Sequence, residues 1–155
     1  YSEVGKVVSW PEYHKELATE QLIGHNDGYA LNTNNYRVYF NPEDGLAWMI
    51  PWDFDYAFLE DSWWGMNWAA PRGVLAAGCF IDPTCLEAHK QTVASVLSSY
   101  DEVQVQAWVD QLNALIYADT QSDPRRECAA TDVAGSIQYV RDWAAARDDA
   151  MKEAS

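Results

Sequence analysis

The stretch GHNDGYALNTNNYRVY, Gly24–Tyr39, decides the fold, and IPWDFDYAF, Ile50–Phe58, completes it. Asn and Asp crowd the first stretch without a helical period, and Tyr36–Phe40 then alternates as a strand does. The turn residues NPEDG follow, and Leu46–Ile50 is typical of a return strand, which Pro51 ends. The sequence therefore predicts an antiparallel hairpin placed between two segments rich in Asp and Asn.

Helices are predicted on both sides of the hairpin, because a two-stranded hairpin is marginal unless other elements cover it. The first helix is expected over about Trp10–Ile23, with Ser9 and Glu12 as a capping box and Gly24 at its end. Its apolar side is modest and consists of Tyr13, Leu17 and Gln21, with Trp10 and Leu22 nearby.

The segment Leu59–Gly78 matches neither period, and we expect a long ordered loop there. Three further helices are predicted: one from Asp82-Pro83 to about Ser98, one capped by Asp101 with Gln104, and one capped by Thr131. The apolar positions of the last two helices are Val105, Trp108, Val109, Leu112, Leu115 and Ile116, then Val133, Ile137, Val140 and Trp143. The fold class expected is α+β, mostly helical.

Length and charge limit the function classes. The 155 residues suggest one domain, and 48% hydrophobic residues are enough for a core. A net charge of −14 repels phosphate backbones, so we expect no nucleic-acid partner, and no apolar run reaches the length of a membrane span. An anionic substrate would need a cation between it and the acidic side chains.

Three cysteines leave the disulfide pattern open. The CFIDPTC spacing favours a local bond between Cys79 and Cys85, with Cys128 left over. A bond between Cys85 and Cys128 is an alternative, and three unpaired thiols are nearly as compatible with the count. No Cys-x-x-Cys pair or Cys/His cluster of zinc type is visible in the sequence.

The spacing of the polar residues indicates a site at one end of the hairpin. Asn32 lies five residues after Asp27, and Asp53 and Asp55 follow the return strand. We expect Asp27, Asn32 and Asp53 to lie close together, with Asp55 near them. Asp27, Asn32 and Asn35 are also typical turn residues that bond their own backbone, but the second acidic motif favours a site.

This order resembles the catalytic half of a protein kinase, where His-Arg-Asp, a later Asn, a hairpin and Asp-Phe-Gly follow one another. A closer resemblance is to the C-terminal part of the spore-coat protein H (CotH) kinase family, which is secreted or displayed on surfaces. It rests on GHNDGYALNTNNYRVYFNPEDG, IPWDFDYAF, RGVL, IDPTCLEAH and SDPRREC. The resemblance spans nearly the whole chain and implies a protein-kinase-like C-lobe with a catalytic-loop hairpin.

The resemblance also implies roles for individual residues. Asp27 matches the catalytic-loop Asp, which accepts the proton of the attacking hydroxyl. Asn32 and Asp53 match the residues that hold Mg²⁺ or Mn²⁺ with ATP, and Asp55, in place of the motif's Gly, is a candidate further metal ligand. Asn35 is expected to hold the loop by hydrogen bonds.

The expected partners are a protein substrate and an N-terminal lobe. The glycine-rich loop, the phosphate-binding Lys and its Glu partner of a kinase are not in this sequence, and the Gly24–Gly28 spacing does not replace them. We therefore interpret residues 1–155 as the larger lobe of a two-lobed extracellular or cell-surface enzyme. On its own it would hold half a nucleotide site and be inactive.

Two other functions stay open. The Trp-rich loop and the acidic surface suit an inactive extracellular binding or structural module, in which a divalent ion such as Ca²⁺ braces the loops. A hydrolase using Asp27 and Asp53 as acid and base is a weaker alternative.

Several aromatic residues have a structural interpretation. His25 and His89 are expected to be packed and hydrogen-bonded, whereas His14, among charges, is expected in solvent. The group Trp63, Trp64 and Trp68 suits either core packing, which we favour, or a stacking surface for sugar or peptide.

Overall fold

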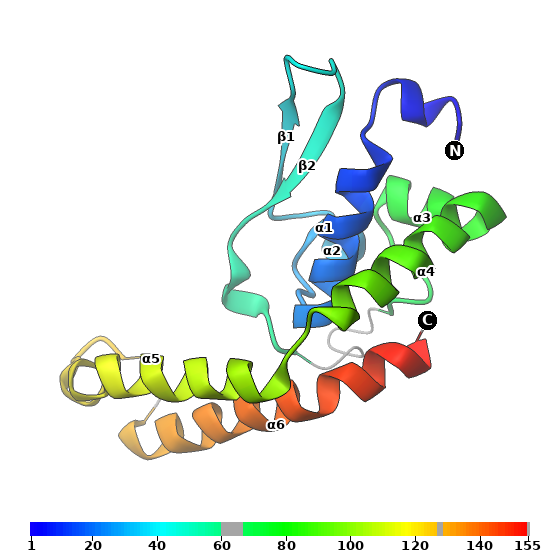
Figure 1. Ribbon diagram of the computed structural model, residues 1–155. Coiled ribbons are helices and arrows are strands. Elements are labelled where there is room, and N and C mark those ends of the chain that lie inside the picture. Colours follow the sequence, from blue (N-terminus) through cyan, green and yellow to red (C-terminus); the bar gives the residue numbers. More distant parts are fainter. Residues whose placement is uncertain (60–66, 127–128, 155) are drawn as a thin grey trace. The chain divides into compact units, whose positions relative to one another are not determined.

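The computed structural model describes residues 1–59, 67–126 and 129–154 (Figure 1). These residues form two compact units, the first made mainly of Tyr1–Ser99 and the second of Tyr100–Glu153. Helix predominates, and the described part of the chain contains one two-stranded sheet. The mostly helical α+β class is therefore confirmed. The two units are defined by packing within the chain. They do not test whether residues 1–155 form one kinase-like lobe, which stays a prediction.

Helix α1, Trp10–Ile23, has the bounds predicted from the sequence and ends at Gly24 in the left-handed conformation, at φ 60°. The predicted capping box is wrong. The backbone N–H of Ser9 donates to the carbonyl of Ala47 at 3.0 Å, so it is not free to bond Glu12. Glu12 instead accepts from the Lys15 ammonium at 2.8 Å.

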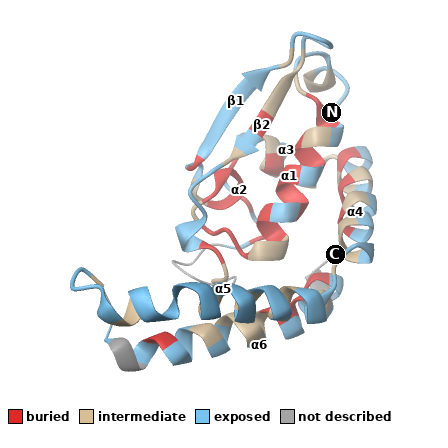
Figure 2. Cartoon of the chain, turned by 60° about the vertical axis from the view of Figure 1, so that its left-hand side comes forward, coloured by how far each residue is buried: buried red, intermediate tan, exposed pale blue. Residues whose placement is uncertain are grey.

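The predicted hairpin is present as β1, Tyr36–Phe40, paired antiparallel with β2, Ala47–Pro51 (Figure 1). The second strand starts and ends one residue later than expected. Its residue Ala47 also forms a parallel bridge with Val8, which ties the N-terminal segment to the sheet. Helix α1 packs on β2, where Met49 is buried, whereas every side chain of β1 is exposed (Figure 2). The expectation that helices cover the hairpin therefore holds for β2 only.

Two short helices flank the first unit's core, α2, Tyr29–Asn32, and α3, Val74–Ile81. Helix α2 lies in a segment predicted to be irregular, and α3 begins inside the predicted loop Leu59–Gly78 and extends beyond it. Helix α3 is apolar nearly all round and only eight residues long, so it presents no polar face from which a helical period could be recognised. Single-turn helices of three residues are η1, Val4–Lys6, and η2, Phe54–Tyr56.

Helix α4, Pro83–Ser98, begins where the sequence predicted, with the Asp82 carboxylate accepting the N–H groups of Thr84 and Cys85 at 2.9 and 3.0 Å. A disulfide joins Cys79 of α3 to Cys85 of α4, as favoured from the spacing. Cys128 lies outside the described residues.

The core of the first unit gathers around α1. Its buried members are Trp10, Tyr13, Leu17, Tyr29, Ala30, Leu31, Met49, Trp68, Ala76, Cys79 and Cys85. His14 belongs to this interior, where its ring stacks on Trp10 with centroids 5.5 Å apart. The expectation that His14 is solvated was wrong, because the buried face of the helix is wider than the apolar stripe and includes polar positions such as His14, Glu16 and Glu20. Burial lowers the pKa of His14 accordingly.

The second unit consists of α5, Glu102–Ser122, and α6, Ala130–Ala154, which run side by side in opposite directions (Figures 1 and 2). Asp101 caps α5 by accepting the N–H of Gln104 at 3.0 Å, as predicted. The Tyr100 hydroxyl donates to the carbonyl of Ala144 at 2.8 Å. The apolar positions of α5 stay largely exposed, and none of its residues is buried. Among the described residues, no helix has both the length and the hydropathy of a membrane span.

Candidate functional site

The segment between α1 and β1 is folded around the carboxylate of Asp27. Its Oδ1 accepts from the side-chain Nδ2 of Asn32, and its Oδ2 accepts from Asn34 and Asn35 at 3.2 and 2.9 Å. Thr33 and Asn35 adopt left-handed backbone conformations, at φ 55° and 48°. Such conformations cost energy in residues other than glycine and gather at functional sites. The Asn-rich sequence thus serves to surround one carboxylate with three amide donors.

Glu20 of α1 holds this loop in place through two hydrogen bonds. Its Oε1 accepts the backbone N–H of Tyr29 at 2.9 Å, and its Oε2 accepts that of Ala30 at 3.1 Å. These two N–H groups belong to the first turn of α2 and have no partner inside that helix. The Glu20 carboxylate, which is fully buried, therefore takes the place of an N-terminal cap.

Glu20 is not among the predicted site residues, although the sequence carries a signal for it. At 3.6 residues per turn, positions 13, 17, 20 and 21 share one side of α1, so Glu20 falls within the predicted apolar stripe. A buried carboxylate needs partners. The chain supplies backbone N–H groups nine and ten residues later, and no local pattern identifies them.

Gly28 permits this close approach. A Cβ at this position would lie 2.1 Å from Oε1 of Glu20 and 2.7 Å from Cδ2 of His25. Downstream chain also holds α2, because the N–H groups of Arg72 and Gly73 both donate to the carbonyl of Ala30 at 2.9 Å. The loop is therefore fixed from α1 and from the segment before α3.

The second acidic motif is held at both of its ends, by the Asp27 loop at one and by the end of α1 at the other. At one end, the Trp52 N–H donates to the carbonyl of Asn35 at 3.1 Å. At the other, the Phe58 N–H donates to the carbonyl of Ile23 at 2.6 Å. Between them, Asp53 has a left-handed backbone at φ 59°, and Asp55 lies in η2.

His25 reports the charge of all three carboxylates. It is fully buried, and its ring packs against Phe54 with centroids 5.0 Å apart. Burial lowers the pKa of His25, and the negative charges of Asp27, Asp55 and Asp53 act in the opposite direction. All three acidic groups are therefore near enough to act on His25, although among the described residues their carboxylate oxygens do not all lie within 4.8 Å of one another. His25 is packed, as the sequence predicted, but the predicted hydrogen bond of its ring is not found among the described residues.

The donor set suits a hard divalent cation. Asn32 gives its amide NH₂ to Asp27, so its Oδ1 is the atom that remains for another partner. Asp53 and Asp55 are exposed carboxylates of the second acidic motif. Oxygen ligands of this kind fit Mg²⁺, Mn²⁺ or Ca²⁺. The carboxylate of Asp27 differs, because amide donors already occupy both of its oxygens.

The Trp-rich loop divides between described and undescribed residues. Trp68 is buried in the core, as we favoured from the sequence. Trp63 and Trp64 lie outside the described residues, so their interpretation as core or stacking surface stays a prediction.

Comparison with known proteins identifies the family of this chain. No curated protein matches the chain. The family model described as CotH kinase protein matches residues 1–151, nearly the entire length. The chain therefore belongs to the CotH kinase protein family.

Proposed function

We propose that this chain is the C-lobe of a secreted protein kinase that transfers the γ-phosphate of ATP to Ser or Thr hydroxyls of extracellular or surface proteins. One observation carries the proposal. The Asp27 carboxylate is held by three amide donors, and the second acidic motif is hydrogen-bonded to the same loop through the N–H of Trp52. Family membership supports a kinase-like activity.

Asp27 acts as the proton acceptor for the attacking hydroxyl. Amide N–H groups from Asn32, Asn34 and Asn35 orient its two oxygens. These amide groups donate hydrogen bonds to the carboxylate and do not compete with it as a base. A carboxylate held in this way is ready for the reaction without rearranging. The substrate hydroxyl would approach the remaining lone pairs of its oxygens.

The nucleotide's cation would be held by Asn32, Asp53 and Asp55. Asn32 contributes its carboxamide oxygen, and the other two contribute carboxylates from the second acidic motif. Bound Mg²⁺ or Mn²⁺ supplies neutralising charge to the phosphates. This matters here, since a net charge of −14 would otherwise repel ATP. The N-terminal lobe would supply the remaining phosphate contacts, so this lobe alone is expected to be inactive.

An extracellular location belongs to the same proposal. The Cys79–Cys85 disulfide and the net acidic surface are compatible with a secreted protein.

The test is phosphate transfer by the full-length protein from labelled ATP to a protein acceptor, with Mg²⁺ or Mn²⁺. Asp27→Ala should abolish transfer, and Asp53→Asn should raise the metal concentration needed. Glu43→Gln is the matched control, because Glu43 is an exposed acidic residue in the hairpin turn. Undiminished transfer by Asp27→Ala would remove this residue from the mechanism.

An inactive binding module is the second candidate function. Exposed apolar side chains gather on the hairpin and just after it, as in Phe40, Ile50, Trp52 and Phe54, a composition that suits a protein-binding surface. In this case a structural Ca²⁺ would brace the loops. Calcium binding by the full-length protein without nucleotide binding would favour this function over the kinase.

A further inference from the structure

A second group of metal-ligating side chains contains no residue of the Asp27 loop. One ring nitrogen of His14 and the sulfur atoms of Cys79 and Cys85 all lie within 4.8 Å of one another. The three residues come from α1, α3 and α4 and are at most 3% exposed. Three separate elements thus bring one nitrogen and two sulfurs to a single buried point.

His14 and His25 are the two histidines whose ring nitrogens are both buried without a partner among the described residues, and of these His14 lies beside the two sulfurs. Neither of its ring nitrogens has a hydrogen-bond partner among the described residues, although the side chain is 97% buried. Buried polar atoms are nearly always partnered, by protein groups, water or an ion. Its neighbours are aromatic rings and the disulfide, none of which satisfies an imidazole nitrogen.

His89 lies beside this group, with its ring centre 5.7 Å from that of His14. It follows Cys85 by four residues, so both face the same side of α4. Its Nε2 is bonded to Oε1 of Gln21 at 2.9 Å, whereas its Nδ1 has no partner among the described residues. A metal-bound histidine typically uses one ring nitrogen for the ion and the other for such an orienting bond.

The two sulfurs are joined in this structure and are not metal ligands in that state, since zinc binds thiolates. We propose that, when the Cys79–Cys85 bond is reduced, Cys79, Cys85 and His14 bind a Zn²⁺ ion and His89 completes the tetrahedron through Nδ1. The disulfide and the metal are thus alternative ways of closing one site. The proposal does not depend on the kinase function.

The chemistry balances with a dithiol reductant. A thiolate of the reductant attacks one protein sulfur and breaks the S–S bond, and its second thiol releases the protein, so the reductant becomes a disulfide. Cys79 and Cys85 gain two electrons and two protons. On binding Zn²⁺ they become thiolates, and both protons pass to solvent.

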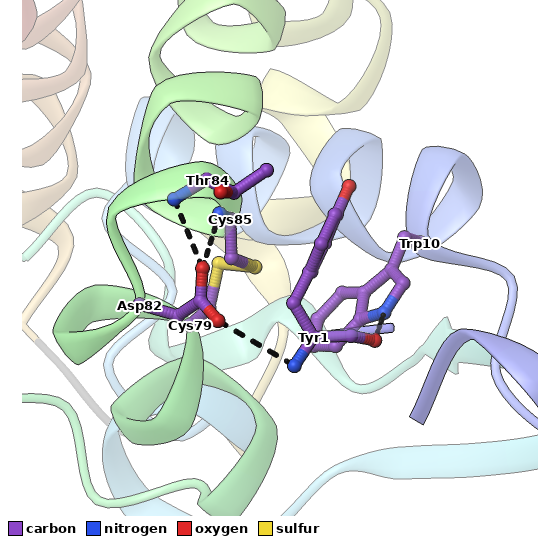
Figure 3. A network of polar contacts seen from close by, with 6 residues as sticks. All are labelled: Tyr1, Trp10, Cys79, Asp82, Thr84 and Cys85. Carbon is purple, nitrogen blue, oxygen red and sulfur yellow. Dashed lines mark hydrogen bonds and ion pairs between the residues drawn. A yellow bond between two sulfur atoms is a disulfide. The ribbon is translucent and has the colours of Figure 1, made fainter. Parts of the chain in front are cut away.

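Zinc binding requires the two sulfurs to separate and the ring of His89 to move toward them, because no nitrogen of His89 lies within 4.8 Å of all three other ligand atoms. Zinc–sulfur bonds of about 2.3 Å place two sulfurs roughly 3.8 Å apart in a tetrahedron. The Cα atoms of the two cysteines are 5.0 Å apart, so rotation of the side chains separates the sulfurs. The Asp82 cap fixes the first turn of α4 and thereby the position of Cys85 (Figure 3).

The neighbouring residues keep this point closed. The Trp10 ring stacks on His14, and the indole N–H donates to the carbonyl of Tyr1 at 2.9 Å (Figure 3). The Tyr1 ring packs on Trp10 in turn, with centroids 5.0 Å apart. Such a closed, dry surrounding is typical of structural zinc sites, in which all four ligands come from the protein.

The experiment uses the chain with Cys128→Ser, so that the two cysteines of the cluster remain. It is titrated with Co²⁺ as a spectroscopic probe, then with competing Zn²⁺, in oxidised and fully reduced forms. We expect one Co²⁺ per reduced chain, with thiolate-to-cobalt charge transfer and tetrahedral d–d bands, and no binding by the oxidised form. Loss of a residue that only hydrogen-bonds a metal ligand lowers metal affinity by about 10–100-fold, and His14→Asn, which removes a ligand itself, should lower it further.

His25→Asn is the matched control, because it removes a histidine outside the cluster and should leave the spectrum and affinity unchanged. Circular dichroism of the oxidised variants checks that each one folds, independently of the metal. His89→Asn should weaken binding and alter the d–d bands, since water would replace one nitrogen. No binding by the reduced chain, equal binding in both redox forms, or unchanged affinity in His14→Asn would each overturn the proposal.

Discussion

Oε1 of Glu20 accepts the backbone N–H of Tyr29 at 2.9 Å, and this bond joins the middle of α1 to the start of α2. The second oxygen of this buried carboxylate accepts the backbone N–H of Ala30, so both oxygens bond the first turn of α2 within the Asn-rich loop. The loop's position therefore depends on a helix residue that precedes it in sequence and carries none of the proposed chemistry.

The first prediction concerns this anchor. Glu20→Ala leaves the N–H groups of Tyr29 and Ala30 buried without an acceptor, so the free energy of unfolding should fall by about 2–4 kcal/mol. Glu12→Ala on the same helix removes only a pair with Lys15 near the surface and should change stability by less than about 0.5 kcal/mol. Urea unfolding followed by circular dichroism measures both. Equal effects of the two substitutions would contradict the anchoring role.

Steric fit at Gly28 gives the second prediction. In Gly28→Ala the new methyl group would collide with Oε1 of Glu20 and the ring of His25, so we expect a loss of about 1–3 kcal/mol. Gly78→Ala provides the control, because nothing lies within 4 Å of its Cβ. An alanine inside α3 should stabilise the chain by roughly 0.5–1 kcal/mol. Thermal unfolding should move in opposite directions for the two variants.

The third prediction concerns the charge pattern around Asp27. Asp27→Asn replaces one acceptor oxygen by an NH₂ group that must face amide donors, so at least one hydrogen bond is lost at a cost of about 1–3 kcal/mol. Hydrogen exchange of the loop amides should accelerate. Asp44→Asn keeps an acceptor for the N–H of Leu46 in the hairpin turn and should leave exchange in the loop unchanged.

A fourth prediction follows from His89. Burial, with a smaller contribution from the charge of His14, lowers the pKa of His89 from 6.5 to about 4. Between pH 6.5 and about 4, His89 binds a proton in the unfolded chain and does not bind one in the folded chain. The stability contribution is therefore complete above pH 6.5 and is lost as the pH falls toward 4. The free energy of unfolding, measured with urea at several pH values in this range, should depend less steeply on pH in His89→Gln than in the unsubstituted chain. An equal dependence on pH would argue against His89 as its source.

The fifth prediction has the opposite sign. Burial, and next the charge of Glu20, raise the pKa of Glu16 well above its ordinary value of 4.5. The folded chain keeps a proton that the unfolded chain releases, so this contribution is present below pH 4.5 and is lost as the pH rises. Glu16→Gln cannot ionise, and its stability relative to the unsubstituted chain should increase with pH. A difference that stays constant with pH would contradict this expectation.

Much of the first unit could be predicted from local sequence. Helix α1, the hairpin and the start of α4 follow from period, turn residues and caps that act over a few positions. Helix α3 escaped prediction because it is short and uniformly apolar, so its ends depend on packing and on the disulfide. The exposed face of β1 could not be foreseen either, since alternation alone does not say what covers each side of a strand.

The candidate site divides in the same way. The sequence by itself determined the order of Asp27, Asn32, Asp53 and Asp55 about a hairpin, because residue type and spacing carry that information. Only the tertiary structure decided that three amides surround Asp27, that Glu20 holds the loop, and that His14 meets two sulfurs inside the core. Hydrogen bonds and metal-ligand geometry act over a few ångströms, between residues whose separation along the chain leaves no local pattern.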